Sequence, residues 1–266
     1  MKYWIKRSVL PFGIVCLMSM ALFGCGREKK EAVTVQPELV IGSDDYEPYN
    51  YQDENGDYAG VDVELAKEAC RRIGYTPVFK QIQWDDKDIY LENGEVDCAW
   101  GSFSMDGRED DYIWVGPYMY SREVVMVRTD SDIYKLDDLA GKNVAVQSST
   151  QPERIFLGQG YDIIPKVKNV YSFVEMNELF AALRKGYVDA CAGHEIVMQE
   201  YLRQSGQKYR ILDEEIIDSK LGVAFSKNKD TQKAEQLRQA MAVFNQHLQR
   251  IGGKRDFVPY FRVAVL

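Results

Sequence analysis

The sequence predicts an α/β protein built from two lobes. Short apolar segments of strand length alternate with longer amphipathic segments, which is typical of sheets covered by helices. A second set of such units begins near residue 136, after the first set has ended. The chain has 266 residues, enough for two modest domains or one large one, and two α/β lobes are the simpler interpretation.

The first set of elements opens with a strand at 39–41, which leads into a Gly-Ser-Asp-Asp turn at 42–45. The Asn-Gly pair within 53–57 favours a hairpin turn, because both positions tolerate a positive φ. An EF-hand calcium loop is excluded at this segment, since Tyr58 stands where the loop requires glycine.

A helix is expected next, with Asp62 as its N-cap, apolar residues at helical spacing up to Ile73 and Gly74 as its stop. The apolar runs that follow predict three strands, at 78–84, 96–100 and 123–127.

The second set begins with a short helix at 136–141, which ends at a glycine, and a strand at 143–147. Ser148, Ser149 and Thr150 are expected to cap the helix after that strand. The remaining predicted elements are an amphipathic helix at 174–185 that ends at Gly186, strands at 188–192 and 221–225, and a long final helix at 231–251.

Residues 1–24 have the features of a secretory signal peptide. Three basic residues precede an apolar run at 9–23, and a small residue ends it. An uncleaved transmembrane anchor is the alternative, but about fifteen apolar residues fall short of the roughly 20 that span a bilayer. Residues 26–37 are charged and lack aromatic side chains, so 25–37 is expected to be a flexible tether.

Cys25 completes a Leu-Phe-Gly-Cys segment that resembles a bacterial lipobox. That resemblance implies that Cys25 carries a lipid and becomes the mature N-terminus. We therefore expect a protein anchored to the cell membrane by lipid, facing the extracellular or periplasmic side.

Charge excludes one class of partner. Residues 1–24 hold three of the 33 Lys and Arg and none of the 41 Asp and Glu, so the rest of the chain has a net charge of −11. An acidic surface repels nucleic acid and anionic lipid headgroups, and we expect neither as a partner. An anionic ligand is not excluded, because it responds to the local field of its cleft.

Cysteine and histidine are too few for a disulfide framework or a zinc site. Apart from Cys16 and Cys25, the chain has only Cys70, Cys98 and Cys191, which we expect to be buried thiols. Its two histidines, His194 and His247, support no zinc proposal, and no cofactor is predicted.

Polar residues follow three of the predicted strands, where ligands of open α/β sheets bind. Tyr46 follows the first strand, the loop 101–108 follows the strand that ends at Trp100, and residues 148–150 follow the strand that ends at Gln147. A guanidinium such as that of Arg108 binds a carboxylate in bidentate fashion, and a helix start with hydroxyls binds anions. Together these groups could hold one carboxylate between two lobes.

Each of these features has a structural alternative. Arg108 precedes three acidic residues, which is typical of a surface ion pair, and residues 148–150 are ordinary N-cap residues. Tyr46 and Trp100 are aromatic residues of a kind usually found in a core or at its rim. His194 does not indicate a hydrolase, because the chain has no Gly-x-Ser-x-Gly elbow.

Eight segments in register resemble the bacterial extracellular solute-binding proteins of the amino-acid type, family 3, over about residues 38–261. The resemblance is carried by Tyr46–Tyr49, Gly60–Ala66, Gly94–Asp97, Arg108, Gly116–Tyr118, Leu136–Gln147, Lys185–Ala190 and Leu221–Phe225.

This resemblance implies the type II periplasmic binding fold, with each lobe a mixed sheet flanked by helices and with two hinge crossings. Residues 38–120 and 221–266 would form lobe 1, and residues 121–220 would form lobe 2. The crossings would fall near 118–123 and 218–221.

The resemblance also implies roles for single residues. Tyr46 would stack on the ligand, and Gly101 would offer its backbone carbonyl. Arg108 would hold the ligand carboxylate, aided by the helix start at Ser148, Ser149 and Thr150.

Three positions depart from the family's pattern. Phe103 replaces the Ser or Thr whose hydroxyl meets the ligand ammonium, and His194, followed by Glu195, replaces the Asp that serves as its counter-ion. Val61 stands where a second stacking aromatic is usual. Because an unpaired buried ammonium is costly, we expect compensation by Glu195, Ser102 or Ser104, or a ligand without a conventional α-ammonium.

Two ligand hypotheses remain open. One is a carboxylate held beside Tyr46, Trp100 and Phe103, such as an aromatic or modified amino acid. The other is an ordinary polar amino acid whose contacts are shifted.

The resemblance implies a monomeric receptor that captures a small carboxylate by lobe closure and delivers it to the permease of an ABC importer. A sensor that signals to a membrane partner is an alternative. A dehydratase-like enzyme on the same fold is another, with His194 and Glu195 as the candidate acid and base.

Overall fold

The computed structural model describes residues 36–251 except 160, 161, 207 and 230, and the side chains among them up to residue 242. The expected signal peptide (1–24), the lipidated Cys25 and all but the last two residues of the expected tether lie outside the described residues.

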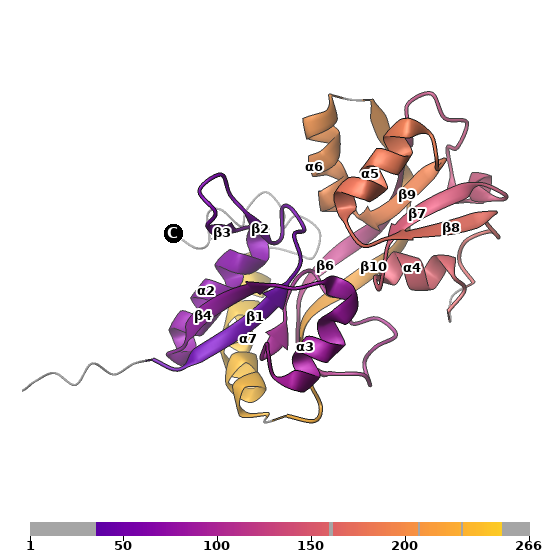
Figure 1. The fold of residues 1–266 in the computed structure, drawn as a ribbon. Helices are drawn as coiled ribbons and strands as arrows, with labels where there is room; N and C mark the ends of the chain where they lie inside the picture. The colour runs from indigo at the N-terminus through magenta and orange to yellow at the C-terminus, as the bar shows by residue number, and fades with distance from the viewer. Residues whose placement is uncertain (1–35, 160–161, 207, 230, 252–266) are drawn as a thin grey trace, which may run out of the picture. The chain divides into compact units, whose positions relative to one another are not determined.

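One mixed sheet runs through the described chain (Figure 1). Its strands follow the order β4-β1-β5-β10-β6-β9-β7-β8, and β2 and β3 form a separate hairpin. The bounds are β1 Glu38–Ser43, β2 Tyr51–Gln52, β3 Tyr58–Ala59, β4 Thr76–Gln81, β5 Cys98–Ala99, β6 Ile113–Arg128, β7 Asn143–Gln147, β8 Asn169–Phe173, β9 Ala190–His194 and β10 Tyr209–Phe225.

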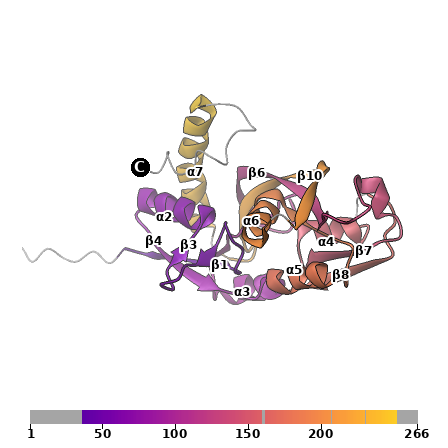
Figure 2. The same cartoon turned by 90° about the horizontal axis from the view of Figure 1, so that it is seen from above.

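Helices flank this sheet, as a second view shows (Figure 2). The α-helices are α2 Val61–Ile73, α3 Lys87–Asn93, α4 Gln151–Phe156, α5 Met176–Lys185, α6 Glu195–Ser205 and α7 Gln232–Ile251, and two 3₁₀ turns are η1 Trp84–Asp86 and η2 Leu136–Leu139. The predicted α/β class is therefore confirmed. Among the described residues, no helix combines the length and apolar character needed to cross a bilayer.

The two long strands β6 and β10 hold the sheet together. They pair antiparallel along most of their length at the centre of the sheet, where β10 also pairs with β5 and β6 also pairs with β9. We use "first half" for β1, β4 and β5 with α2, α3 and α7, and "second half" for β7, β8 and β9 with α4, α5 and α6. The segments 118–123 and 218–221, expected as crossings, lie opposite each other in this ladder.

Several predicted elements are confirmed in place. The strand at 39–41 lies in β1, the Asn-Gly turn joins β2 to β3, and the final helix is α7. Gly74 and Gly186 end α2 and α5 in the left-handed conformation, with φ of 72° and 73°.

Other elements differ from the prediction. Helices α3 and α6 and strand β8 were not predicted, β5 is only two residues long, and 136–139 forms a 3₁₀ turn. Helix α3 was hidden by the acidic and amide residues of its short sequence, and β8 lies at the sheet edge with a largely exposed face.

The prediction that Asp62 caps α2 is wrong. Gly60 is the N-cap, with a φ of 118°, and a Cβ there would lie 2.2 Å from the Tyr49 carbonyl oxygen. Asp62 instead lies buried in the first turn, where its Oδ2 accepts bonds from the Ser102 N–H (2.7 Å), the Tyr118 hydroxyl (2.9 Å) and the Asn50 amide (3.4 Å). Burial raises the pKa of Asp62 to about 7. This carboxyl joins the loop 101–108, strand β6 and the segment before β2.

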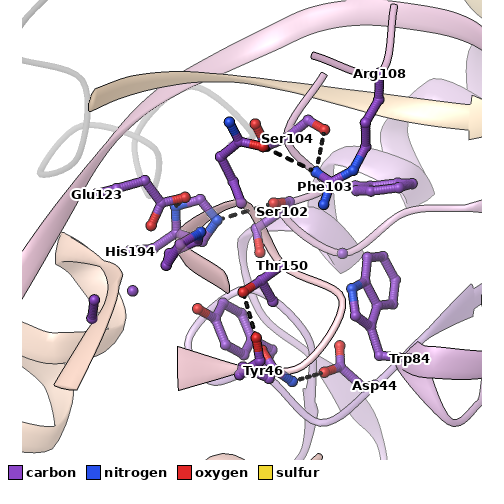
Figure 3. A pocket seen from close by; sticks show the side chains of 16 residues that line it. Asp44, Tyr46, Trp84, Ser102, Phe103, Ser104, Arg108, Glu123, Thr150 and His194 are labelled. Carbon is purple, nitrogen blue, oxygen red and sulfur yellow. Dashed lines mark hydrogen bonds and ion pairs between the residues drawn. The ribbon is translucent and has the colours of Figure 1, made fainter. Parts of the chain in front are cut away.

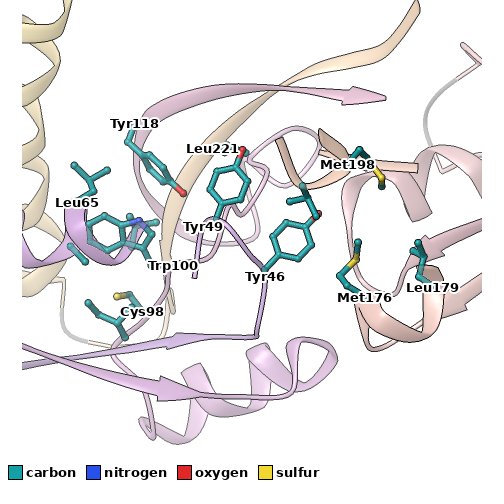
Figure 4. Packing of buried hydrophobic residues seen from close by; sticks show 14 of the residues in the cluster. Tyr46, Tyr49, Leu65, Cys98, Trp100, Tyr118, Met176, Leu179, Met198 and Leu221 are labelled. Atoms are coloured by element: carbon teal, nitrogen blue, oxygen red, sulfur yellow. The ribbon is translucent and has the colours of Figure 1, made fainter. Parts of the chain in front are cut away.

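Apolar side chains pack around this carboxyl and across the sheet (Figure 4). Trp100 is fully buried and its ring centroid lies 5.9 Å from that of Tyr118. Cys70, Cys98 and Cys191 are buried free thiols, as predicted.

We expect Asp62→Ala to destabilise the protein, because three donors would lose a shared buried acceptor. Each unsatisfied buried donor costs about 1–3 kcal/mol, so the free energy of unfolding should fall by about 2 kcal/mol or more. Urea unfolding followed by circular dichroism measures this change. The control is Glu64→Ala in the same turn, an exposed partner of Lys67, which should change stability by less than about 0.5 kcal/mol. Equal effects of the two substitutions would contradict the bracing role of Asp62.

Candidate ligand-binding site

A pocket lies where residues of both halves meet around the sheet (Figure 3). Its cavity of about 20 Å³ has room for about one water molecule, so an organic ligand could enter only if the walls separate. The pocket is lined by Asp44, Tyr46, Trp84, Gly101, Ser102, Phe103, Ser104, Arg108, Glu123, Gln147, Thr150, Gln151, Pro152, Ala192, Gly193 and His194.

Arg108 reaches this pocket from the loop after β5 and is 6% exposed. Its Nη1 donates to the Ser104 carbonyl oxygen at 3.1 Å, and its Nη2 donates to the Ser149 carbonyl oxygen at 3.1 Å. No carboxylate of the described residues lies within ion-pair distance of it. Burial, and then the nearby charge of Arg154, lower the pKa of Arg108 to about 10, so it stays charged at neutral pH. The surface ion pair weighed from the sequence is therefore not formed.

Phe103 provides the surface on which this guanidinium rests. The Arg108 Cζ lies 5.2 Å from the Phe103 ring centroid, and the Lys87 Nζ lies 5.5 Å from it. Trp84, Tyr112 and Trp114 pack around the Phe103 ring, with ring centroids 5.0 to 5.2 Å from its own, and the Tyr112 and Trp114 centroids lie 5.3 Å apart. Aromatic faces attract cations, so the Phe103 departure creates a cation-binding platform within the wall.

Lys87 is a second buried cation beside the pocket, and it was missed in the sequence. It begins α3, is 4% exposed, and donates to the Ser149 hydroxyl at 2.9 Å. Burial lowers its pKa to about 8. Its place in an unpredicted helix among acidic neighbours concealed it.

The segment 148–150 lies at the pocket, but several of the donors expected to bind an anion already donate to other groups of the protein. The Ser149 N–H donates to Glu153 Oε2 at 2.6 Å, the Ser148 N–H donates to the Phe173 carbonyl, and the Thr150 hydroxyl donates to the Gln147 carbonyl. Helix α4 has only six residues, and Thr150 forms no side-chain cap. Thr150 lines the pocket, whereas Ser148 and Ser149 lie behind it.

Hydrogen bonds join the halves across the pocket. The Gln147 amide of β7 donates to Asp44 Oδ2 at 2.7 Å, and the Arg154 guanidinium of α4 donates to the Gly107 carbonyl at 2.9 Å. Burial raises the pKa of Asp44 to about 6. These bonds, with those of Lys87 and Arg108 to Ser149, hold the walls together.

Tyr46 and His194 form the opposite wall. Their ring centroids lie 6.0 Å apart in an edge-on arrangement, and Tyr46 stacks on Tyr49 at 6.1 Å. A Cβ on Gly193 would lie 2.7 Å from the Met198 Cε and 3.6 Å from the Tyr46 hydroxyl, so the flexible end of Met198 would have to move.

Glu123 is the second residue that the sequence analysis missed. It is fully buried on β6, lines the pocket, and lies 3.2 Å from His194, measured from Oε1 to Nδ1. Its Oε2 has no hydrogen-bond partner among the described residues. The signal was present, because Glu123 shares a strand face with the buried Val125 and Val127.

Two predicted site residues lie elsewhere. Trp100 belongs to the core, where it is fully buried beside Tyr118, and it does not line the pocket. Glu195 accepts a bond from Arg122 at 2.9 Å, and it does not line the pocket. Within the described part of the chain, no cluster of His, Cys, Asp or Glu could hold a metal ion.

Comparison with known proteins agrees with this architecture. The model of the bacterial extracellular solute-binding proteins, family 3, matches residues 39–251. The L-cystine-binding protein TcyA of Bacillus subtilis (strain 168) is 26% identical over 218 residues, covering 76% of this chain and 79% of TcyA. The arginine-binding extracellular protein ArtP of the same organism is 26% identical over 235 residues, covering 85% of this chain and 88% of ArtP.

A solved structure has the same fold. An ancestral arginine-binding protein bound to glutamine superposes with a TM-score of 0.71 at 25% identity, covering 80% of this chain and 93% of that protein. The match of the family model over most of the chain decides the assignment. The chain belongs to the bacterial extracellular solute-binding proteins, family 3.

Proposed function

We propose that this protein captures an amino acid or a related small carboxylate between two closing lobes and delivers it to the permease of an ABC importer. The named relatives bind cystine and arginine, and the superposed structure holds glutamine, so amino acids are the ligand class to test first. The single observation that carries the proposal is the buried guanidinium of Arg108, which faces the pocket without a carboxylate partner among the described residues.

The physical argument concerns desolvation. Burying a cation is costly, and carbonyl oxygens only partly replace its hydration. A ligand carboxylate would supply both the opposite charge and two parallel hydrogen bonds. Of the candidate residues named from the sequence, Tyr46, Gly101, Ser102, Phe103, Thr150 and His194 line the same pocket as Arg108.

Lobe closure follows from the position of the bonds across the pocket. Residues 38–120 and 221–266 would move as lobe 1, and 121–220 as lobe 2, about the paired segments of β6 and β10. Ligand that touches both lobes only when they are closed favours the closed population. The bonds from Lys87 and Arg108 to Ser149 would then give way to the ligand and re-form around it.

The proposal includes a monomer tethered to the membrane by lipid on Cys25. A dehydratase-like reaction has less support, because Glu195 is held by Arg122 outside the pocket.

We expect Arg108→Ala to weaken binding of the preferred amino acid at least about 30-fold, because truncating one partner of a buried charge pair costs about 2–5 kcal/mol. Isothermal titration calorimetry measures the affinity. Arg71→Ala, an exposed arginine on α2 paired with Glu68, is the control and should bind as the unmodified protein does. Unchanged affinity of the Arg108 variant would remove this residue from the site.

A thermal-shift screen over the twenty amino acids, cystine and other small carboxylates identifies the ligand. Ligand that binds only the folded state stabilises it by about 2.7 kcal/mol at 100 times its dissociation constant. For a chain of this size the melting temperature should rise by roughly 5–10 °C. If no amino acid and no other small carboxylate produces a shift, the proposed function is wrong.

A further inference from the structure

A buried carboxyl and a buried imidazole face each other in the wall of the pocket. Glu123 of β6 and His194 at the end of β9 are directly opposite in the antiparallel ladder. The Glu123 side chain is fully buried, and that of His194 is 8% exposed. Figure 3 shows both side chains on the side of the pocket away from Trp84.

Hydrogen-bond chemistry places the proton. His194 Nε2 lies 3.1 Å from the Ser102 carbonyl oxygen, which can only accept, so Nε2 carries a hydrogen. In the neutral ring Nδ1 is then an acceptor, and it faces Glu123 Oε1 at 3.2 Å. Two facing acceptors repel, and Nδ1 has no hydrogen-bond donor among the described residues, so a carboxyl proton on Glu123 stabilises this pair in the empty site.

Burial agrees with this assignment. It raises the pKa of Glu123 to about 8 and lowers the pKa of His194 to about 4, so the neutral pair is favoured at pH 7. The Ser219 hydroxyl donates to Glu123 Oε1 at 3.3 Å. The other charged or titratable groups that act on Glu123 come from the loops after β1 and β5: Tyr46, Tyr49, Asp106 and Arg108.

The oxygen Oε2 remains available for a ligand. It is buried and unpartnered among the described residues, and Glu123 lines the same pocket as Arg108. Other candidates for a ligand cation are engaged: Glu195 with Arg122, and the Ser104 hydroxyl with Asp106.

We propose that Glu123 binds the ammonium group of a zwitterionic ligand whose carboxylate lies on Arg108, and that this ammonium displaces the proton of the Glu123–His194 pair. The inference rests on the proposed function and specifies its ligand as one with a free amino group. The Glu123 carboxylate accepts N–H bonds from the ammonium, and the displaced proton passes to a buffer base. The Glu123 O–H bond breaks and the buffer base gains the proton, and no bond between heavy atoms changes.

Ligands with and without the amino group test this proposal. If arginine raises the melting temperature, the pair is L-arginine with 5-guanidinovalerate; if cystine does, it is L-cystine with 3,3′-dithiodipropionate; any other amino acid is paired with its des-amino acid. We expect Glu123→Gln to weaken the amino acid at least about 10-fold and its des-amino analogue less than about 3-fold. Glu215→Gln, an exposed partner of Arg122, is the matched control and should change neither.

Proton release gives a second readout. Calorimetry at pH 6.5 in phosphate and in imidazole buffers should show close to one proton released per amino acid bound to the unmodified protein, and close to none for Glu123→Gln. Equal weakening of both ligands, or release that persists in the variant, would overturn the role of Glu123. The proposed function would survive that result, whereas it fails separately if neither kind of carboxylate binds.

The pH dependence of stability checks that the variant folds and that the carboxyl is protonated. The pKa of Glu123 is raised from 4.5 to about 8, so the folded state holds a proton that the unfolded state loses, and raising the pH through this window weakens the fold. The melting temperature of Glu123→Gln relative to the unmodified protein should therefore rise from pH 5 to pH 8. A difference independent of pH would contradict the shared proton.

Discussion

The site depends on a cation that is buried without an opposite charge beside it. The Arg108 guanidinium is almost fully withdrawn from solvent, yet its direct partners are carbonyl oxygens and the amide of Gln151. A charge in this position lowers the stability of the empty, closed protein and favours an anion that completes its coordination. A binding protein gains from this arrangement, because part of the free energy of ligand binding then drives closure.

Neighbouring carbonyl oxygens and an aromatic ring partly stabilise the buried charge of Arg108. The face of Phe103 and the carbonyls of Ser104 and Ser149 lie against the guanidinium, and Asp62 holds the loop that carries Phe103 and Ser104 through the Ser102 N–H. Phe103 and Ser104 belong to the same loop as Arg108, whereas Ser149 comes from the segment between β7 and α4. Packing and cation–π attraction to Arg108 thus explain why phenylalanine stands at position 103, and no contact with a ligand is needed to explain it.

The two ends of the pocket differ in charge. Arg108 and Lys87 are cations near the Phe103 ring, whereas Glu123 and His194, in the wall built by β6 and β9, form a neutral pair that becomes anionic when its proton leaves. Such a division suits a small molecule with separated charges. Asp44, which accepts a hydrogen bond from Gln147 across the pocket, is a further acceptor beside the ligand.

The sequence by itself determined the α/β class, the order of most strands, the glycine stops of α2 and α5, and the importance of the loop that carries Arg108. These follow from local periodicity, turn chemistry and a resemblance spread along the chain, none of which requires contacts between distant residues. Tertiary structure alone decided that Asp62 braces the core, that Trp100 and Glu195 point away from the pocket, and that Glu123 and Lys87 border it. The reason is physical: burial and partner choice arise only when segments distant in the sequence pack together, as Glu123 and Ser219 do at a separation of 96 residues. Those contacts set which charges remain available to a ligand.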